Sequence, residues 1–414
     1  MEERIIFHVD VNNAFLSWTA VYLLNNGYKI DIRKIPSIIG GDEKQRHGIV
    51  LAKSPVAKRF GIKTAETIYQ AKKKCPNLKN YPPNYRFYYE QSAKLMNYLA
   101  QYTPVLEQFS IDECFLDMTG TKYLYDDYLK LAKKIKDEVK DKFGFTVNIG
   151  IGNNKLCAKM ASDFEKPDKV HTLLKTEIEN KLWPLDVGEL FMCGKKTKEI
   201  LNKLGINTIK DLAHTDYKKL ERHLKNQAKY LIESAWGIDN SKVNEKNAKN
   251  QSISTSETFP YDLVEEEKIK EILFRQTAEV TRELRQKKLY TKTVAIIYKN
   301  SDFSSYSAQA KLENPTDNTK EIFKLVIKIF EKSYRKYPIR LIGVRLADLK
   351  KTKETQLTIF DTEKDLSLEE NDIQKTMDTI NEKFGKSIVA PASLKVIGTT
   401  NSKKNHQVFS NKHN

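Results

Sequence analysis

Phe109-Ser110-Ile111-Asp112-Glu113-Cys114-Phe115-Leu116 places two acidic residues between two short apolar runs. Such runs predict two strands of a hairpin, with Asp112 and Glu113 at or near its tip. A similar run, Ile5-Ile6-Phe7-His8-Val9, predicts a buried strand that ends in Asp10. Three carboxylates are therefore expected where strands end, and many α/β proteins carry their chemistry at such positions.

Helical and strand patterns alternate around these runs. Helices are predicted at residues 85–102 and 122–142, and a strand at residues 145–151. Together with the first strand and the hairpin they give the order βαββαβ, which is that of the split, ferredoxin-like arrangement. In such a sheet the first strand and the hairpin can lie side by side, so Asp10, Asp112 and Glu113 could share one site.

The rest of the chain divides by composition into an insertion with turn signals, a region of short helices, a polar linker, a second βαββαβ unit and a polar, flexible tail. These segments lie at residues 23–80, 171–240, 241–251, 252–350 and 351–414, respectively. The second βαββαβ unit carries no acidic residues placed like those of the first.

The length of 414 residues predicts about two to four domains. The net charge of +17 favours a polyanionic partner, because each Lys or Arg near a phosphate releases condensed counterions. A basic, solvated surface without such a partner is the alternative.

Targeting and redox signals are lacking in the sequence. The four cysteines have no CxxC spacing, so we expect reduced thiols. The first residues do not form a signal peptide, and no apolar run approaches the ~20 residues that span a bilayer. We therefore expect a cytoplasmic protein that does not enter a membrane.

Three carboxylates converging from different strands suit phosphoryl transfer onto a sugar hydroxyl. Two divalent ions about 3.5–4 Å apart can assist both the attacking and the leaving oxygen. Mg²⁺ prefers oxygen ligands, and it usually takes one or two carboxylates plus substrate phosphates. The alternative is an exposed acidic turn and an unrelated aspartate at a strand end.

Three motifs carry a resemblance to a known family. They are Asp10-Val11-Asn12-Asn13-Ala14-Phe15, Ser110-Ile111-Asp112-Glu113 and Ala161-Ser162-Asp163-Phe164-Glu165-Lys166-Pro167. In this order they closely resemble the signatures of the Y-family DNA polymerases, especially the bacterial members, and the resemblance covers nearly the whole chain.

The resemblance implies an α+β multidomain fold. Residues 1–22 and 81–170 would form a ferredoxin-like palm, and residues 23–80 the fingers inserted into it. Residues 171–240 would form a helical thumb with a helix-hairpin-helix. Residues 252–350 would form the little finger, a second ferredoxin-like domain.

The resemblance also implies a metal site and a sugar gate. Asp10, Asp112 and Glu113 would hold two Mg²⁺ ions, with the Val11 backbone carbonyl as a further ligand. Phe15 matches the steric-gate position, where an aromatic ring collides with a 2′-hydroxyl. Without the family, Phe15 would be interpreted as an ordinary core aromatic residue.

Two lysines match positions that bind the incoming triphosphate. Lys166 matches a family lysine, whereas Lys58 stands where the family usually has an arginine. Three residues earlier, Pro55 replaces a tyrosine of many members, which removes one phosphate contact. Lysine is a point charge and cannot form the bidentate fork of arginine.

Two further segments resemble contact motifs. The hairpin Gly194-Lys195-Lys196-Thr197 resembles one that offers backbone N–H groups to a DNA phosphate, with a plain helix–helix turn as the alternative. In the tail, Gln356-Leu357-Thr358-Ile359-Phe360 matches the peptide by which bacterial polymerases dock on the sliding clamp. Leu357, Ile359 and Phe360 would enter an apolar groove, and Gln356 would bond at its edge.

The resemblance implies a monomeric, template-directed DNA polymerase of low fidelity that copies past lesions. It would bind primer–template DNA and add dNTPs to the primer 3′ end. Two alternatives use the same residues: a non-catalytic, clamp-tethered DNA-binding protein with the polymerase fold, and a metal-dependent nuclease.

Overall fold

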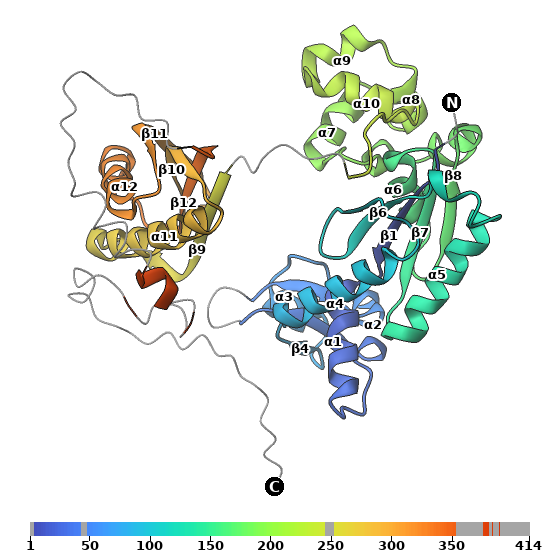
Figure 1. Ribbon diagram of the computed structural model, residues 1–414, viewed down its shortest axis with the longest axis horizontal. Coiled ribbons are helices and arrows are strands. Elements are labelled where there is room, and N and C mark those ends of the chain that lie inside the picture. The colour runs from blue at the N-terminus through green and yellow to red at the C-terminus, as the bar shows by residue number, and fades with distance from the viewer. Residues whose placement is uncertain are drawn as a thin grey trace. The chain divides into compact units, whose positions relative to one another are not determined.

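The computed structural model describes residues 4–42, 48–244, 252–352, 376–380, 383 and 389. The chain divides into two compact units, Met1–Asn247 and Ala248–Asn414 (Figure 1). Each unit has a sheet and a hydrophobic core of its own.

Five strands form the main sheet of the first unit, in the order β5-β6-β1-β7-β8. They are β5 (Leu106–Gln108), β6 (Glu113–Asp117), β1 (Ile6–Val11), β7 (Val147–Gly152) and β8 (Val170–Leu173). β1 lies in the middle and pairs antiparallel with both β6 and β7. The first four strands have the expected ferredoxin-like order, and β8 adds a parallel strand that was not predicted.

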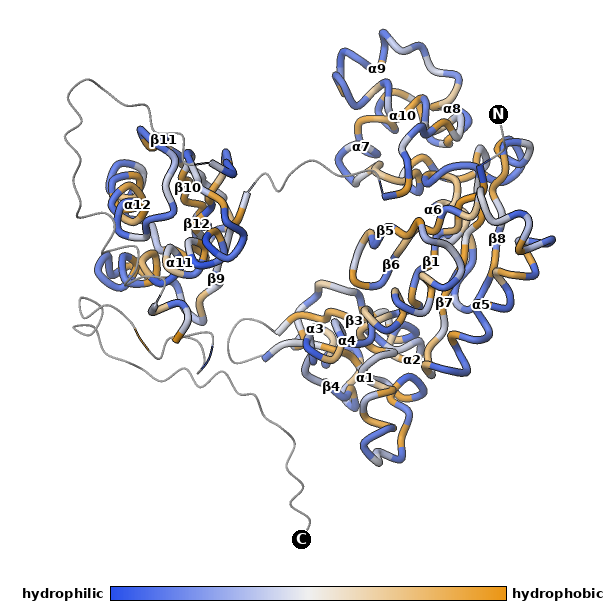
Figure 2. The backbone as a smooth tube through the Cα atoms, viewed as in Figure 1, coloured by the Kyte–Doolittle hydropathy of each residue, from blue (hydrophilic) through white to orange (hydrophobic). Residues whose placement is uncertain are grey.

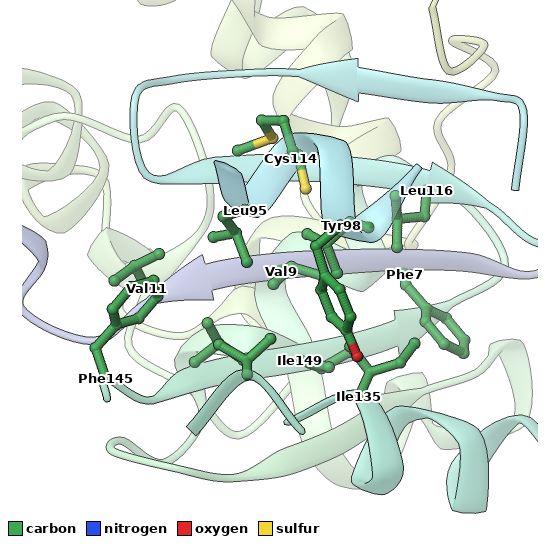
Figure 3. Packing of buried hydrophobic residues seen from close by; sticks show 14 of the residues in the cluster. Phe7, Val9, Val11, Leu95, Tyr98, Cys114, Leu116, Ile135, Phe145 and Ile149 are labelled. Carbon is green, nitrogen blue, oxygen red and sulfur yellow. The ribbon is translucent and has the colours of Figure 1, made fainter. Parts of the chain in front are cut away.

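Alternate residues of β1 face opposite sides of the sheet. Phe7, Val9 and Val11 pack with residues of α4 (Tyr85–Leu99) and α5 (Tyr128–Phe143), as Figure 3 shows. The residues between them, His8 and Asp10, face α6 (Lys155–Asp163) on the other side. The acidic residue of β1 is therefore directed toward a single helix.

Two glycines of β7 let α6 lie directly on the sheet. A Cβ atom at Gly150 would lie 2.0 Å from the Ala158 carbonyl oxygen, and one at Gly152 would lie 2.5 Å from the Ala158 nitrogen. Gly150 is also the cross-strand partner of His8. These glycines thus serve close packing of a helix on a strand, and they bring α6 next to His8.

The insertion forms a three-stranded sheet in the order β3-β2-β4. Its elements are β2 (Ser37–Gly40), β3 (Val50–Lys53), α2 (Pro55–Arg59), α3 (Ile68–Lys74) and β4 (Lys79–Tyr81), and α1 (Ala14–Asn25) leads into it from β1. It has a small core of its own that includes Ile38, Val50 and Ile68.

Short helices follow α6, as expected. They are α7 (Lys195–Lys203), α8 (Ile209–Ala213), α9 (Tyr217–Leu224) and α10 (Gln227–Ala235). Shorter 3-10 and π turns are η1 (Ile32–Lys34), η3 (Thr119–Thr121), η4 (Lys175–Glu177), η5 (Ile178–Leu182) and η6 (Val187–Glu189). This helical region shares a core with α6 through Leu156 and Cys157.

The second unit has the expected βαββαβ order of elements. They are β9 (Ser252–Leu263), α11 (Glu266–Gln286), β10 (Tyr290–Asn300), β11 (Ser305–Thr316), α12 (Thr319–Ser333) and β12 (Ile339–Lys350). The strand order is β11-β10-β12-β9, so the first strand lies at the edge of this sheet. Buried apolar residues of the strands and of both helices form one core, and Figure 2 shows hydrophobic stretches along these elements.

The acidic hairpin differs in detail from its prediction. The strand predicted at residues 109–111 is wrong, because β5 ends at Gln108. The N–H groups of Phe109 and Ser110 both donate to the Glu113 carbonyl, which closes a turn instead of extending a strand. Asp10 likewise lies inside β1 and not beyond its end.

The expectations about membrane-spanning segments and about the cysteines can be compared with the described residues. Within that part of the chain, no helix has the length and apolar character needed to cross a bilayer. Cys75, Cys114, Cys157 and Cys193 are all buried and none of them forms a disulfide in the structure.

Candidate active site

The carboxylates of the two strands lie side by side, as expected. Asp10 of β1 is the cross-strand partner of Glu113 of β6. The Val11 N–H donates to the Asp112 carbonyl at 3.0 Å. Residues about a hundred positions apart thus meet at the centre of the sheet.

Two lysines neutralise these carboxylates. The Nζ atom of buried Lys159 lies 3.1 Å from Glu113 Oε1, 3.5 Å from Asp10 Oδ2 and 3.4 Å from Asp163 Oδ2. Lys166 Nζ lies 2.7 Å from Asp10 Oδ2 and 2.8 Å from Asp163 Oδ1. Three carboxylates and two ammonium groups therefore form one network.

Burial and charge act in opposite directions on the two central carboxyls. Burial raises the pKa of Asp10, and the nearby Lys166 and Lys159 charges only partly offset it. Burial also favours a higher pKa for Glu113, but the His8 contact and the Lys159 charge outweigh it and hold that pKa at about 2. Glu113 is therefore ionised at neutral pH.

The donor set fits a divalent metal ion, although the side chains do not form a closed cage. Among the described residues, no group of three or more His, Cys, Asp or Glu side chains is arranged to hold an ion alone. The Asp112 carboxylate accepts from Ser110 Oγ at 2.6 Å. Because Mg²⁺ usually keeps waters and takes substrate phosphates, an open set of oxygen donors suits it.

Phe15 lies in the first turn of α1, five residues after Asp10. Its ring stacks on Tyr88 with centroids 4.8 Å apart and contacts Tyr85 edge-on. The ring is only partly buried. Its orientation is therefore fixed by aromatic neighbours while part of it stays accessible.

Lys58 is exposed on α2, and a second lysine, Lys53, lies near it. Burial and the Lys58 charge lower the pKa of Lys53, so the two ammonium groups lie near each other. Asn13, just before α1, donates from Nδ2 to the Lys53 carbonyl at 2.7 Å. Pro55 is the first residue of α2, where an N–H group has no helical partner to lose.

The predicted DNA hairpin lies at the start of α7. Gly194 is the N-cap residue, so the first-turn N–H groups of Lys195, Lys196 and Thr197 precede any helical acceptor. Met192 has a positive φ of 67°, a conformation that favours glycine. The predicted clamp peptide, Gln356 to Phe360, lies outside the described residues.

Sequence reasoning assigned no role to His8, Lys159 or Asp163, which lie in or beside the network. His8 and Asp10 are two positions apart on a strand, which places them on one face. Lys159 and Asp163 are four positions apart on a helix, and so are neighbours. Both spacings were visible, but nothing in the sequence indicates that α6 covers β1.

Comparisons with known proteins agree with this geometry. The model of the impB/mucB/samB family matches residues 9–163, and that of its C-terminal domain matches residues 250–359. A DNA polymerase IV of Clostridium acetobutylicum is 45% identical over 391 residues, which cover 94% of this chain and 98% of the relative. The chain belongs to the Y family of DNA polymerases.

Further relatives support this membership. DNA polymerase IV 1 of Bacillus subtilis is 34% identical over 94% of this chain and 92% of its own. A solved Y-family DNA polymerase chimera of Dbh and Dpo4 has a TM-score of 0.71 at 25% identity, and the match covers 83% of this chain and 99% of that one.

This Y-family polymerase is an enzyme that extends DNA from deoxynucleoside triphosphates and copies past lesions. Its family depends on divalent metal ions. Membership therefore removes both alternatives, the non-catalytic DNA-binding protein and the nuclease.

Proposed function

We propose that Asp10, Asp112, Glu113 and the Val11 carbonyl hold two Mg²⁺ ions for nucleotidyl transfer. The observation that carries this proposal is the pairing of Asp10 with Glu113 on adjacent central strands. Asp112 adjoins that pair, because its carbonyl accepts a hydrogen bond from the Val11 N–H.

In the reaction, the primer 3′-hydroxyl forms a bond to the α-phosphorus of a dNTP, and the bond to the pyrophosphate oxygen breaks. When bound, the two ions would supply charge stabilisation at the attacking and the leaving oxygen. The protein's part is positioning. Lys159 and Lys166 stay protonated because the carboxylates raise their pKa values despite burial, so they balance the negative site.

We assign the triphosphate to Lys166 and Lys58. Lys166 already bonds Asp10 and Asp163, which places its ammonium group at the edge of the carboxylate network. Lys58, with Lys53 beside it, supplies positive charge from α2. Pro55 leaves only backbone and lysine contacts on this side, so the grip should depend strongly on charge.

Phe15 is proposed as the steric gate. Its stacking on Tyr88 holds the ring in one orientation, and a rigid ring excludes a 2′-hydroxyl better than a mobile one. Replacing Phe15 with Ala should allow ribonucleotide incorporation while deoxynucleotide extension continues.

The domain boundaries are proposed from the resemblance to the Y family. Residues 1–22 and 81–170 correspond to the palm, residues 23–80 to the fingers, residues 171–240 to the thumb and residues 252–350 to the little finger. The α7 hairpin would donate backbone N–H groups to a DNA phosphate. Residues 351–414 would carry the clamp peptide, with Gln356, Leu357, Ile359 and Phe360 as its contacts, and the enzyme would act as a monomer.

Primer extension tests the proposed site. Wild-type protein with Mg²⁺, dNTPs and a primed template should extend the primer, and the Glu113→Gln variant should not. The matched control is Glu165→Gln, an exposed carboxylate beside the network. Full extension by Glu113→Gln would overturn the assignment of metal ligands.

A further inference from the structure

His8 is fully buried beneath the carboxylate network and has two polar neighbours. Its Nδ1 atom lies 2.8 Å from Ser162 Oγ, and its Nε2 atom lies 3.3 Å from Glu113 Oε2. Nε2 is buried and makes no hydrogen bond of good geometry in the described part of the chain, so Glu113 Oε2 is the acceptor that lies within reach of it. The proton positions on this ring therefore decide whether Glu113 Oε2 faces an N–H donor or a nitrogen lone pair.

The Ser162 hydroxyl carries one proton and has two acceptors in reach. They are the Lys159 carbonyl at 2.7 Å and His8 Nδ1 at 2.8 Å. If the proton goes to the carbonyl, Nδ1 must be protonated, and a neutral ring then turns the Nε2 lone pair toward the Glu113 carboxylate. Two buried acceptors that face each other are unfavourable.

The other arrangement satisfies every group. If Ser162 donates to Nδ1, then Nε2 carries the proton and donates to Glu113. The Lys159 carbonyl does not need Ser162, because in α6 it accepts from the N–H four residues later. A ring protonated on both nitrogens would also direct an Nε2 proton toward Glu113, so the contact with Glu113 Oε2 is the same in both cases.

We infer that Ser162 fixes His8 as the Nε2–H tautomer, and that His8 is a positioning residue for the Glu113 carboxylate. The inference rests on the proposed function of Glu113 as a metal ligand. His8 holds Oε2, while Lys159 contacts Oε1 at 3.1 Å. Both oxygens are thereby fixed, so the carboxylate cannot rotate about its last bond when an ion binds.

The glycines of β7 make this contact possible. Gly150 is opposite His8, and its missing Cβ lets α6 approach until Ser162 reaches the ring. A hydrogen-bonded partner behind a metal-binding carboxylate orients it, and losing such a partner typically costs about 10- to 100-fold in metal affinity or activity.

The first test reads the tautomer in the metal-free protein. Protein labelled with ¹⁵N-histidine is compared with His8→Gln, which identifies the His8 signals by their loss. Long-range ¹H–¹⁵N correlation should show His8 as the Nε2–H form and, in Ser162→Ala, as a mixture. An Nδ1–H form in wild type would overturn the inference without touching the metal ligands.

The second test uses variants that differ in the position of one amide. A glutamine nitrogen occupies about the place of Nε2, whereas an asparagine nitrogen occupies that of Nδ1 and cannot reach Glu113. Mn²⁺ affinity, measured by spin resonance with primed template and a non-hydrolysable dNTP analogue, should fall about 10- to 100-fold in His8→Asn. His8→Gln should retain most of it, with kcat following affinity and the KM for dNTP changing less.

His171→Phe is the matched control. His171 is on the same sheet as His8, and its Nε2 atom lies 4.0 Å from Glu165 Oε2. It should leave Mn²⁺ affinity unchanged. Equal losses in His8→Asn and His8→Gln, at unchanged thermal stability, would overturn the positioning role. If Glu113→Gln also kept full Mn²⁺ affinity, the proposed function itself would fail, so the two failures are distinguishable.

Discussion

The first strand of each βαββαβ unit occupies a different place in its sheet. β1 lies between β6 and β7 and is buried at every residue. β9 lies at an edge, pairs with β12, and exposes six of its twelve residues. The same order of elements therefore yields a shielded central strand in one unit and a solvated edge strand in the other.

This difference decides what each strand can carry. The Asp10 carboxylate on β1 is enclosed by strands and by α6, where two lysines offset its charge. On β9 the carboxylate of Glu257 is half exposed and bonds Arg275 of α11. Partners of a shielded carboxylate can shift its pKa, whereas solvent screens an exposed one.

The largest contrast should appear when one acidic residue is removed from each unit. Asp112→Ala should lower primer extension by about a thousandfold or more, since metal assistance contributes several kcal/mol to the transition state. Glu257→Gln should extend primers like wild type. Primer extension measures the rate, and a DNA mobility shift should show retained binding in both variants. Extension by Asp112→Ala would mean that the central strand pair is not the reaction site.

Packing on the two sheets should differ next. Gly150→Ala places a methyl group against the α6 backbone and should cost about 3 kcal/mol or more of unfolding free energy. Gly343→Ala on β12 meets a side-chain atom and a carbonyl of β9, both at 2.7 Å, and should cost less because an edge strand can shift. Gly120→Ala, with open space around it, is the control. Urea unfolding measures all three, and equal costs at 150 and 343 would contradict the distinction.

Acid should weaken the helices of the first unit before those of the second. Glu138 on α5 accepts from Tyr98, Lys142 and Tyr102, which hold its pKa at about 2. Since this pKa is depressed in the fold, the contribution is complete above about pH 4.5 and disappears as the pH falls toward 2. Glu138→Gln should cost about 1 kcal/mol at pH 7, after screening by solvent, and nothing at the lowest pH. Thermal unfolding across this range measures the difference, and a pH-independent cost would refute the linkage.

The smallest effect is expected at the exposed ion pair of the second unit. Arg275 and Glu257 are about half exposed. Arg275→Ala should change the unfolding free energy by about 1 kcal/mol or less, and less still in high salt. A loss above about 2 kcal/mol in urea unfolding would show that this pair is shielded as strongly as the Asp10 carboxylate on β1.

Much of the architecture could be predicted from local patterns. The runs around Val9 and Phe115 are apolar and short enough to indicate buried strands, and the βαββαβ order then places Asp10 near Glu113. Strand order in the second unit could not be predicted, because the same order of elements is compatible with β9 at the centre or at the edge. Pairing between distant strands decides that, and no local signal reports it.

The site was predictable only in part for a similar reason. Lys159 is interpreted from the sequence as an ordinary lysine on a helix, and it is buried only because Gly150 and Gly152 admit α6 onto the sheet. His8 looks like one more member of a buried strand. β8 was missed because Val170 to Leu173 is short and half polar, and becomes a strand through pairing with β7.

The hydrogen bond from the Asn13 side chain to the Lys53 carbonyl links the segment of the proposed steric gate to the segment of the proposed triphosphate contacts. Asn13 precedes Phe15 by two residues, and Lys53 ends the strand that leads into α2. A rocking movement of the inserted sheet would pull on the first turn of α1. Discrimination against ribose and retention of the triphosphate would then change together.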